Sequence, residues 1–315
     1  MEIEFTSEGF PSPGPVQNGG NVLSVTWNDL LWAAITVGRP NRHFVFQHGV
    51  SSLYEALFRA SALRMSLEQT SAGSRRLRRT SAAKSLDPSE KGAINYFLGL
   101  TFCKLFAEME LGAPWLLHLD VFRDRLNPRL LSGRSRPDLV GLTHDGKWLA
   151  LESKGRVSQP TSDAKTKAKE QAERIISVGS AAVTYRIGGI TFFKNDILRF
   201  FWRDPRPDGS EPPNEVKLAV TEDEVWRLYY QPILRLLESN RTAVGDNYQF
   251  AIQEADFNIT VLPEVIRLLR LEKWKDAANW CIENHELLIK EKVHRDGLKI
   301  VAGQSWIKPF ENIMG

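Results

Sequence analysis

The chain has 315 residues, of which 42% are hydrophobic and 25% charged, a composition that fits a folded protein with one large domain or two modest ones. No apolar run reaches the ~18 residues that a membrane span needs, and no signal-peptide pattern is present, so we expect a cytoplasmic protein without a membrane partner. The two cysteines lack partners at zinc-ligand spacing, which argues against a structural zinc site, and a net charge of +3 is too small to indicate nucleic acid by itself.

The first quarter of the sequence predicts a leader followed by helices. Residues 1–21 are rich in Pro and Gly, which favours a flexible leader. Residues 22–85 contain two runs dense in Leu, Ala and Trp, and we interpret them as a helical N-terminal extension. This extension ends in a basic connector that includes "SRRLRR" at 74–79, which we expect to be exposed.

The next segment, residues 86–205, has the pattern of an α/β core. A long helix is predicted at its start, with Ser89 as the cap and Gly112 as the stop. Three strand-like runs follow with no helix between them, which is typical of an antiparallel meander. A second helix is expected over residues 161–178, opened by Thr161, Ser162 or Asp163, and further strands come after it. After a Pro-rich break, residues 206–315 are predicted to be mainly helical.

Charged residues stand in two of the strand-like runs of this core. Side chains two apart on a strand share a face, so Glu152 and Lys154 point the same way. A two-residue hairpin loop would place Asp138 opposite Ser153, whereas a three-residue loop would place it opposite Glu152. Gly146 suits the left-handed position that the longer loop requires, so we favour the three-residue loop and a pair of carboxylates beside a lysine.

Chain direction predicts which other charged residues lie at the same edge of the sheet. The long helix runs antiparallel to the first strand, so its N-terminal residue Glu90 should reach the edge that carries Asp138 and Glu152. The cations expected at the margins of this edge are Arg123, Arg129, Arg134 and Arg136 in the first connection, and Lys165 and Lys169 on the second helix.

Pro137-Asp138 and Glu152-Ser153-Lys154, with apolar strands around them, resemble the signature of the PD-(D/E)xK, or restriction-endonuclease-like, nuclease superfamily. Glu90 matches the helix glutamate that many members have. The resemblance covers roughly residues 86–203. It implies an α/β fold with a restriction-endonuclease-like core, in which an α-β-β-β-α-β mixed sheet is flanked by helices. The helical N-terminal and C-terminal extensions would lie outside this core.

The resemblance also implies a function and a metal. Asp138, Glu152, the Ser153 carbonyl and Glu90 would hold Mg²⁺ or Mn²⁺, and Lys154 would assist the attacking water. The expected activity is hydrolysis of phosphodiester bonds in nucleic acid, with double-stranded DNA as the expected substrate.

Other interpretations of these residues stay open. A catalytically silent module that binds nucleic acid or a partner protein is the alternative to an enzyme. A subunit of a bacterial defence or restriction complex and a homodimer are also open. Each charged residue taken singly has an ordinary interpretation, as a turn residue, a cross-strand ion pair or a helix-dipole contact. We interpret His118 and the C-terminal tryptophans as core residues.

Overall fold

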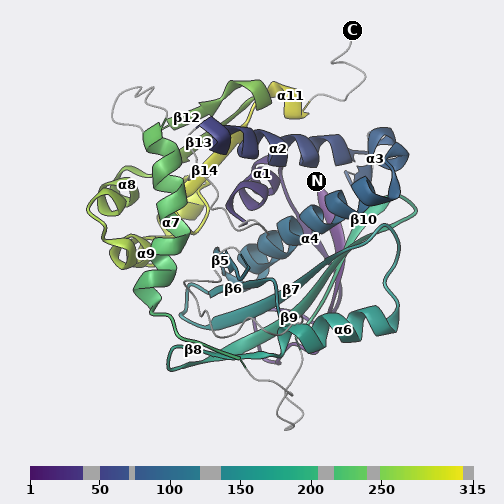
Figure 1. The fold of residues 1–315 in the computed structure, drawn as a ribbon, viewed down its shortest axis with the longest axis horizontal. Coiled ribbons are helices and arrows are strands. Elements are labelled where there is room, and N and C mark those ends of the chain that lie inside the picture. The colour runs from purple at the N-terminus through teal and green to yellow at the C-terminus, as the bar shows by residue number, and fades with distance from the viewer. Residues whose placement is uncertain (38–49, 71–74, 121–135, 205–215, 240–248, 308–315) are drawn as a thin grey trace.

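A large mixed β-sheet with helices on both faces organises the mixed α/β fold (Figure 1). The computed structural model describes residues 1–37, 50–70, 75–120, 136–204, 216–239 and 249–307. The main path of the sheet runs β2-β1-β10-β9-β7-β6-β5, and short strands attach beside it. The strands of the path are β1 (Glu2–Glu8), β2 (Gly19–Ser24), β5 (Trp115–His118), β6 (Leu139–Leu142), β7 (Trp148–Gly155), β9 (Ala181–Lys194) and β10 (Ile197–Arg203).

The strand directions explain where helices are needed. β5, β6 and β7 form the predicted antiparallel meander, and antiparallel pairs need no crossover helix. β7 and β9 run parallel, and a parallel pair needs a crossover, which contains α6 (Ser162–Ala172). Thr161 caps this helix by accepting a hydrogen bond from the Ala164 amide at 3.2 Å. The helix is shorter than predicted, because β-branched residues that follow it form the strand β8 (Ile175–Val178) instead.

Two helices pack on opposite faces of the sheet around β7. α4 (Pro88–Leu111) lies on the face of Gly155, where an added Cβ would come within 1.6 Å of the Asn95 oxygen. α6 lies on the face of Gly188, where an added Cβ would come within 2.8 Å of the Lys169 amide nitrogen. Gly188 pairs with Glu152, and side chains alternate along a strand, so Glu152 faces α6 while Gly155 faces α4.

The ends of α4 follow elementary capping rules. Asp87, rather than the predicted Ser89, is the N-cap, because its carboxylate accepts from the amides of both Ser89 and Glu90. Pro88 occupies the first helical position, where its missing N–H costs nothing. Gly112 ends the helix with φ 62°, as predicted.

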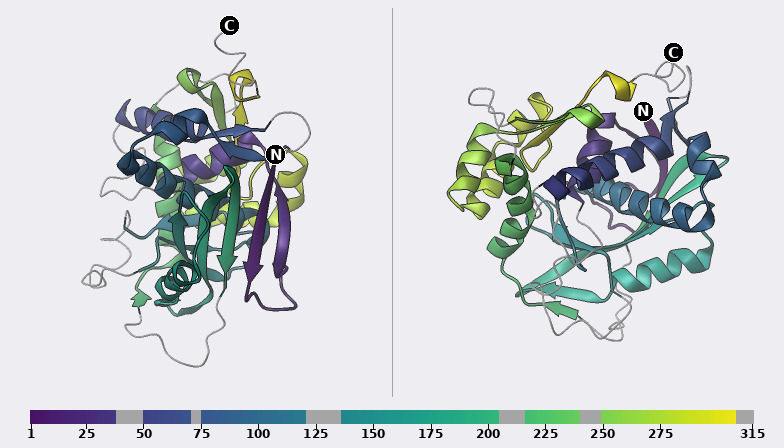
Figure 2. Two further views of the ribbon diagram at one scale, coloured as in Figure 1. Left: turned by 90° about the vertical axis from the view of Figure 1, so that its right-hand side faces the viewer. Right: turned by 45° about the horizontal axis from the view of Figure 1, so that its top comes forward.

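The predicted flexible leader is wrong, because residues 1–21 contribute strands to the main sheet. β1 lies between β10 and β2 (Figure 2), and its side chains alternate so that Ile3 and Phe5 are buried. The Pro- and Gly-rich stretch lies in the connection between β1 and β2. Composition averaged over the segment therefore hid a seven-residue strand with the period-two pattern of a half-buried sheet.

The N-terminal extension contains the predicted helices and also two short strands. Its elements are α1 (Trp27–Thr36), α2 (Val50–Ser66), β3 (Leu67–Gln69), β4 (Leu77–Arg79) and α3 (Ser81–Ser85). Part of the basic connector forms β4, which pairs with β3 and contacts β10. Leu77 is buried in this strand, so the connector is anchored to the sheet rather than fully exposed.

The C-terminal region combines helices with a small antiparallel sheet of order β12-β13-β14. Its helices are α7 (Glu222–Ser239), η2 (Gln253–Ala255), α8 (Pro263–Arg270), α9 (Trp274–Glu283), α10 (His285–Lys290) and α11 (Gln304–Ile307), and its strands are β11 (Val216–Leu218), β12 (Gln249–Ile252), β13 (Phe257–Val261) and β14 (Leu298–Ala302). Of the three tryptophans predicted as core residues, Trp274 and Trp306 are buried, and Trp280 is partly buried against the core. Within the described ranges, no helix combines the length and the apolar character required to cross a membrane.

Candidate functional site

The register of the β6–β7 hairpin decides where Asp138 lies. Leu139 pairs with Leu151, and the Thr143 amide donates to the Lys147 carbonyl at 3.0 Å. The turn therefore has three residues, and Gly146 adopts the left-handed φ of 78° that this loop requires. The same register, continued by one residue, places Asp138 opposite Glu152. The predicted three-residue loop is confirmed.

Asp138 and Glu152 form a pair of carboxyl groups on the α6 face, which we call the carboxyl pair. Asp138 Oδ2 accepts a hydrogen bond from the Ser153 amide at 2.8 Å. Glu152 is buried, with 1% of its surface exposed, and one of its oxygens pairs with the Lys154 ammonium. The other oxygen, Oε2, has no hydrogen-bond partner among the residues that the structure describes. An acceptor is thus left available in a buried acidic site.

Burial dominates the ionisation of the carboxyl pair. It raises the pKa of Asp138 to about 6, although the hydrogen bond from the Ser153 amide acts in the opposite direction. It raises the pKa of Glu152 to about 8, and the neighbouring charge of Asp138 raises this pKa further. Two ionised carboxylates at this depth need a positive charge beside them. Lys154 supplies one, and its side chain is 39% exposed, so the ammonium also reaches solvent.

Glu90 is placed away from the carboxyl pair. Its carboxylate accepts a hydrogen bond from the Asp87 amide at 3.2 Å in the capping box of α4. The helix passes the end of β7 at Asn95, and Glu90 lies five residues earlier, about 7.5 Å further along the axis. Among the described residues, no group of three or more His, Cys, Asp or Glu side chains is arranged to hold a metal ion.

Three of the predicted basic residues, Arg123, Arg129 and Arg134, lie outside the described residues. Arg136 is described, and its Nε donates to Asp120 Oδ1 at 2.7 Å. This ion pair lies near the carboxyl pair, since the charges of both partners affect the pKa of Asp138.

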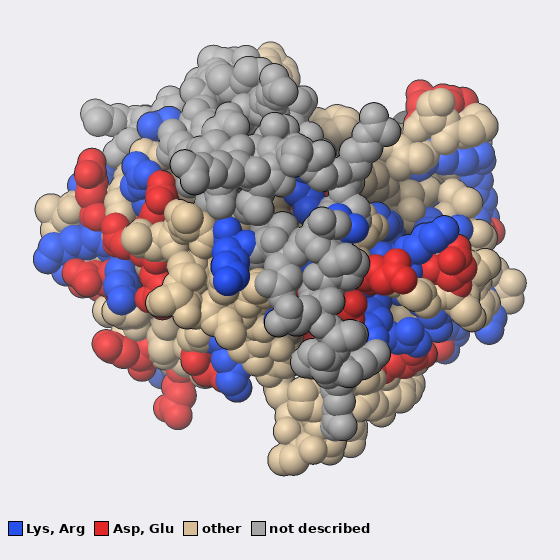
Figure 3. All heavy atoms as spheres, turned by 60° about the horizontal axis from the view of Figure 1, so that its bottom comes forward, with Lys and Arg blue, Asp and Glu red and all other residues tan. Residues whose placement is uncertain are grey.

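The two predicted lysines of α6 are engaged with other groups. Lys165 lies 3.6 Å from a carboxylate oxygen of Glu8, and its Nζ is 3.8 Å from the centroid of the Phe201 ring. Lys169 lies 3.6 Å from Glu173. On the face shown in Figure 3, Lys and Arg side chains alternate with Asp and Glu side chains. Lys165 and Lys169 therefore belong to local ion pairs, and this edge of the sheet is less uniformly basic than the sequence predicted.

Tyr96 and His118 lie on the α4 face of the sheet, opposite the face of the carboxyl pair, and the sequence did not identify them as neighbours of Asp138. The Asp120 amide donates to His118 Nδ1 at 3.2 Å, so this nitrogen is an acceptor and the proton resides on Nε2. Nε2 lies 3.1 Å from the Tyr96 hydroxyl and donates to its oxygen. The proton of the Tyr96 hydroxyl is then available to another acceptor.

The charge of Asp138 connects this tyrosine to the carboxyl pair. Burial raises the pKa of Tyr96, and the largest contribution from a charged neighbour comes from Asp138. His118 is buried on β5, as predicted, but its hydrogen bond to a helix residue carries no signal in the sequence, because residues 96 and 118 belong to different elements. The chain matches no protein-family model, no curated protein and no solved structure.

Proposed function

We propose that the chain is a metal-dependent nuclease of the PD-(D/E)xK type, with Asp138, Glu152 and Lys154 at its catalytic centre and double-stranded DNA as its substrate. The observation that carries the proposal is the β6–β7 register, which sets two carboxyl groups opposite each other with a lysine on the same strand face. Among the described residues, the order of α4, β5, β6, β7, α6 and β9 is compatible with the α-β-β-β-α-β arrangement of that superfamily, and β8 is inserted before β9.

The donor set fits a small, hard cation. Mg²⁺ is commonly held by one or two carboxylates, with waters and substrate phosphate oxygens completing the octahedron. Asp138 and Glu152 would hold the ion, and the unpartnered Glu152 Oε2 is the acceptor that supports this fit. The N–H and C=O of one strand residue point to the same side, so the Ser153 carbonyl points toward the side of Asp138, like its amide. Glu90 would have to leave its capping contact to join them.

The side chains of the site have distinct roles in the proposed hydrolysis. A bound divalent ion lowers the pKa of coordinated water and neutralises negative charge on the phosphate. Lys154 orients the attacking water, because its ammonium lies beside Glu152 and reaches solvent.

One observation favours the alternative of a catalytically silent module that binds nucleic acid or a partner protein. Lys154 pairs directly with Glu152, and in an inert protein this contact is an ordinary ion pair. Metal binding separates the two functions, because only the nuclease requires a cation at the carboxyl pair. Calorimetry with Mn²⁺ on EDTA-treated protein, in the presence of a short duplex, measures it directly.

The nuclease is tested by cleavage of plasmid and short duplex DNA after removal of metal with EDTA and addition of Mg²⁺ or Mn²⁺. We expect the wild type to cut, and Asp138→Asn and Glu152→Gln to be inactive. Lys154→Ala should be slower by about a hundredfold or more, as expected for loss of a proton-transfer group. Asp163→Asn is the matched control, because Asp163 is an exposed acid that pairs with Lys167 on α6. Cleavage by the three site variants at the rate of the control would rule out this site.

A further inference from the structure

A pocket of about 910 Å³ lies between the N-terminal extension and the C-terminal region. One wall is the second half of α2, the next is the segment from β4 to α3, and the third comes from η2 and α11. None of its lining residues belongs to the carboxyl pair or to the groups around it. Its volume lies in the range of pockets that accept small organic molecules.

The walls of this pocket are fixed by hydrogen bonds between distant parts of the chain. Arg64 Nη2 donates to the Ser305 carbonyl at 3.2 Å and so joins α2 to α11. The amide and hydroxyl of Ser305 donate to Asp256 Oδ2 at 2.9 and 2.7 Å. Trp306 Nε1 donates to the Ala255 carbonyl at 2.7 Å. The cavity is therefore preformed, which lowers the entropic cost of binding a ligand.

Two cations on the second wall are held by exposed ion pairs. Arg78 Nε lies 2.8 Å from Glu68, and these side chains are 47% and 25% exposed. Lys84 Nζ lies 2.6 Å from Asp196, and these side chains are 45% and 36% exposed. Ion pairs this exposed contribute little to stability, so an anion in the pocket can compete for both cations. The basic connector thus supplies anion-binding groups at this pocket.

The remaining lining restricts the kind of anion. Ala60, Met65, Ala82 and Trp306 provide apolar surface, which favours a ligand with an aromatic body. Glu68, Glu254 and Asp256 also line the pocket, and they disfavour a ligand with several negative groups. We propose that this pocket binds a small aromatic anion with a single phosphate or carboxylate, the class to which nucleoside monophosphates belong. The proposal is independent of the nuclease function.

The test uses the full chain with the Glu152→Gln substitution, so that the carboxyl pair cannot act on the probe. Calorimetry with each of the four common nucleoside 5′-monophosphates should detect binding of at least one of them. The matching nucleoside lacks the anionic group, and inorganic phosphate lacks the aromatic body. Each should therefore bind at least about tenfold more weakly.

Variants locate the bound probe. Arg78→Gln and Lys84→Gln should each weaken binding by about tenfold, since each removes a charge-assisted contact. Ser61→Trp fills the cavity from an exposed rim position and should abolish binding. Arg267→Gln is the control, because Arg267 is an exposed arginine that pairs with Glu264 on α8, and it should leave binding unchanged. Absence of binding by all four monophosphates at millimolar concentration, or binding that Ser61→Trp leaves intact, would overturn the proposal.

Discussion

At the edge of the sheet, the pKa of a side chain depends on how deeply that side chain is buried. Burial disfavours the charged form, so it raises the pKa of an acid and lowers the pKa of a base. Burial is the largest cause of both shifts, which raise the pKa of Glu152 to about 8 and lower that of His118 to about 4. His118 therefore stays neutral down to mildly acidic pH.

The neutral state of His118 predicts a loss of stability in acid. Its pKa is about 4 in the folded protein and 6.5 for an unperturbed imidazole, so the unfolded chain binds more protons between these two values. The free energy of unfolding should therefore fall as the pH is lowered from 6.5 toward 4, by up to about 3 kcal/mol from this residue. His118→Gln removes the titrating group and should reduce the slope. Urea unfolding of both proteins between pH 7 and pH 4 measures it, and equal slopes would contradict the assignment.

At the scale of elements, two glycines allow α4 to lie directly on the end of β7. A Cβ on Gly155 would come within 1.6 Å of the Asn95 oxygen, and a Cβ on Gly99 would come within 2.9 Å of the Gly155 nitrogen. Neither neighbour is a flexible side-chain end that can easily move aside. This close packing fixes the height of the helix above Ser153, whose amide holds Asp138.

Gly155→Ala should consequently destabilise the protein by about 3 kcal/mol, because the new methyl group meets backbone. Gly92→Ala is the matched change on the same helix, at an exposed position where an added Cβ meets nothing within 4 Å. It should stabilise the protein by about 0.5–1 kcal/mol through helix propensity. Urea denaturation compares the two variants. A Gly155→Ala protein as stable as the wild type would show that the helix can shift away from the strand.

The same packing explains how much of the site could be predicted from the sequence. Pairing of Asp138 with Glu152 depends on one hairpin, and Gly146 carries the signal for its loop length. The place of Glu90 depends on how far α4 extends past the strand end, which the contact between Asn95 and Gly155 sets. The position of a helix along a neighbouring strand does not change the pattern of apolar residues in either element, so it could not be predicted from the sequence.

The sequence predicted the order of the whole sheet less well, because some of its strands pair with partners that are far away in the chain. β5, β6 and β7 are consecutive strands in the chain, and consecutive strands usually pair with each other, so the order of the meander follows from their order in the sequence. β1 instead pairs in parallel with β10, nearly two hundred residues later, with partners such as Phe5 and Phe200. Alternating burial of Ile3 and Phe5 identifies a strand but does not identify its partner. Pairing across this separation is decided by the packing of the whole domain.

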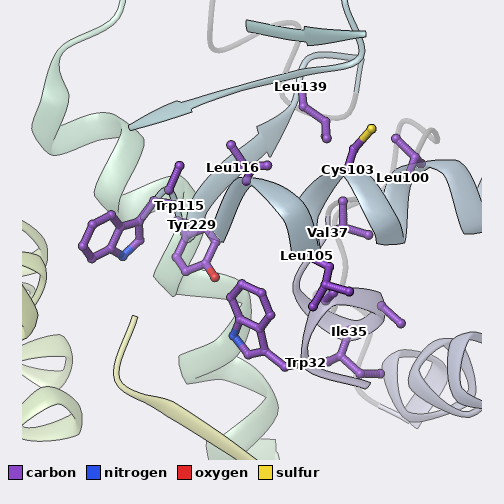
Figure 4. Close-up of a cluster of buried hydrophobic side chains, with 14 of the residues drawn as sticks. Trp32, Ile35, Val37, Leu100, Cys103, Leu105, Trp115, Leu116, Leu139 and Tyr229 are labelled. Carbon is purple, nitrogen blue, oxygen red and sulfur yellow. The ribbon is translucent and has the colours of Figure 1, made fainter. Parts of the chain in front are cut away.

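At the scale of the whole molecule, a buried polar cluster joins the C-terminal region to the N-terminal helices. Trp32 of α1 and Tyr229 of α7 point toward each other in Figure 4, and both donate to Asp296 Oδ2, at 2.9 and 2.6 Å. Lys104 of α4 lies 3.1 Å from the Tyr229 hydroxyl and 4.5 Å from the centroid of the Trp32 ring. The Leu298 amide donates to Asp296 Oδ1 at 3.0 Å. Four separate elements thus meet at one fully buried carboxyl group.

This cluster predicts that α1, α4, α7 and β14 unfold together. Asp296→Asn should lower the free energy of unfolding by about 3 kcal/mol or more, because it removes the negative charge beside the buried Lys104. Burial already lowers the pKa of Lys104 to about 7, which shows how strongly this position disfavours an uncompensated cation. Asp163→Asn removes a carboxylate that is 72% exposed, so it should change stability by less than about 0.5 kcal/mol.

A double-mutant cycle tests whether the loss of stability in Asp296→Asn comes from the unpaired charge of Lys104 or from altered packing. Lys104→Met removes the cation at similar volume, so the combination with Asp296→Asn should lose less stability than the sum of the two single changes. Urea unfolding followed by both tryptophan fluorescence and circular dichroism should give coincident transitions, since the cluster links three helices to the small C-terminal sheet. Additive losses would mean that Lys104 and Asp296 act independently. Separate transitions would mean that the C-terminal region unfolds by itself, which the hydrogen bonds of Asp296 to Trp32 and Tyr229 argue against.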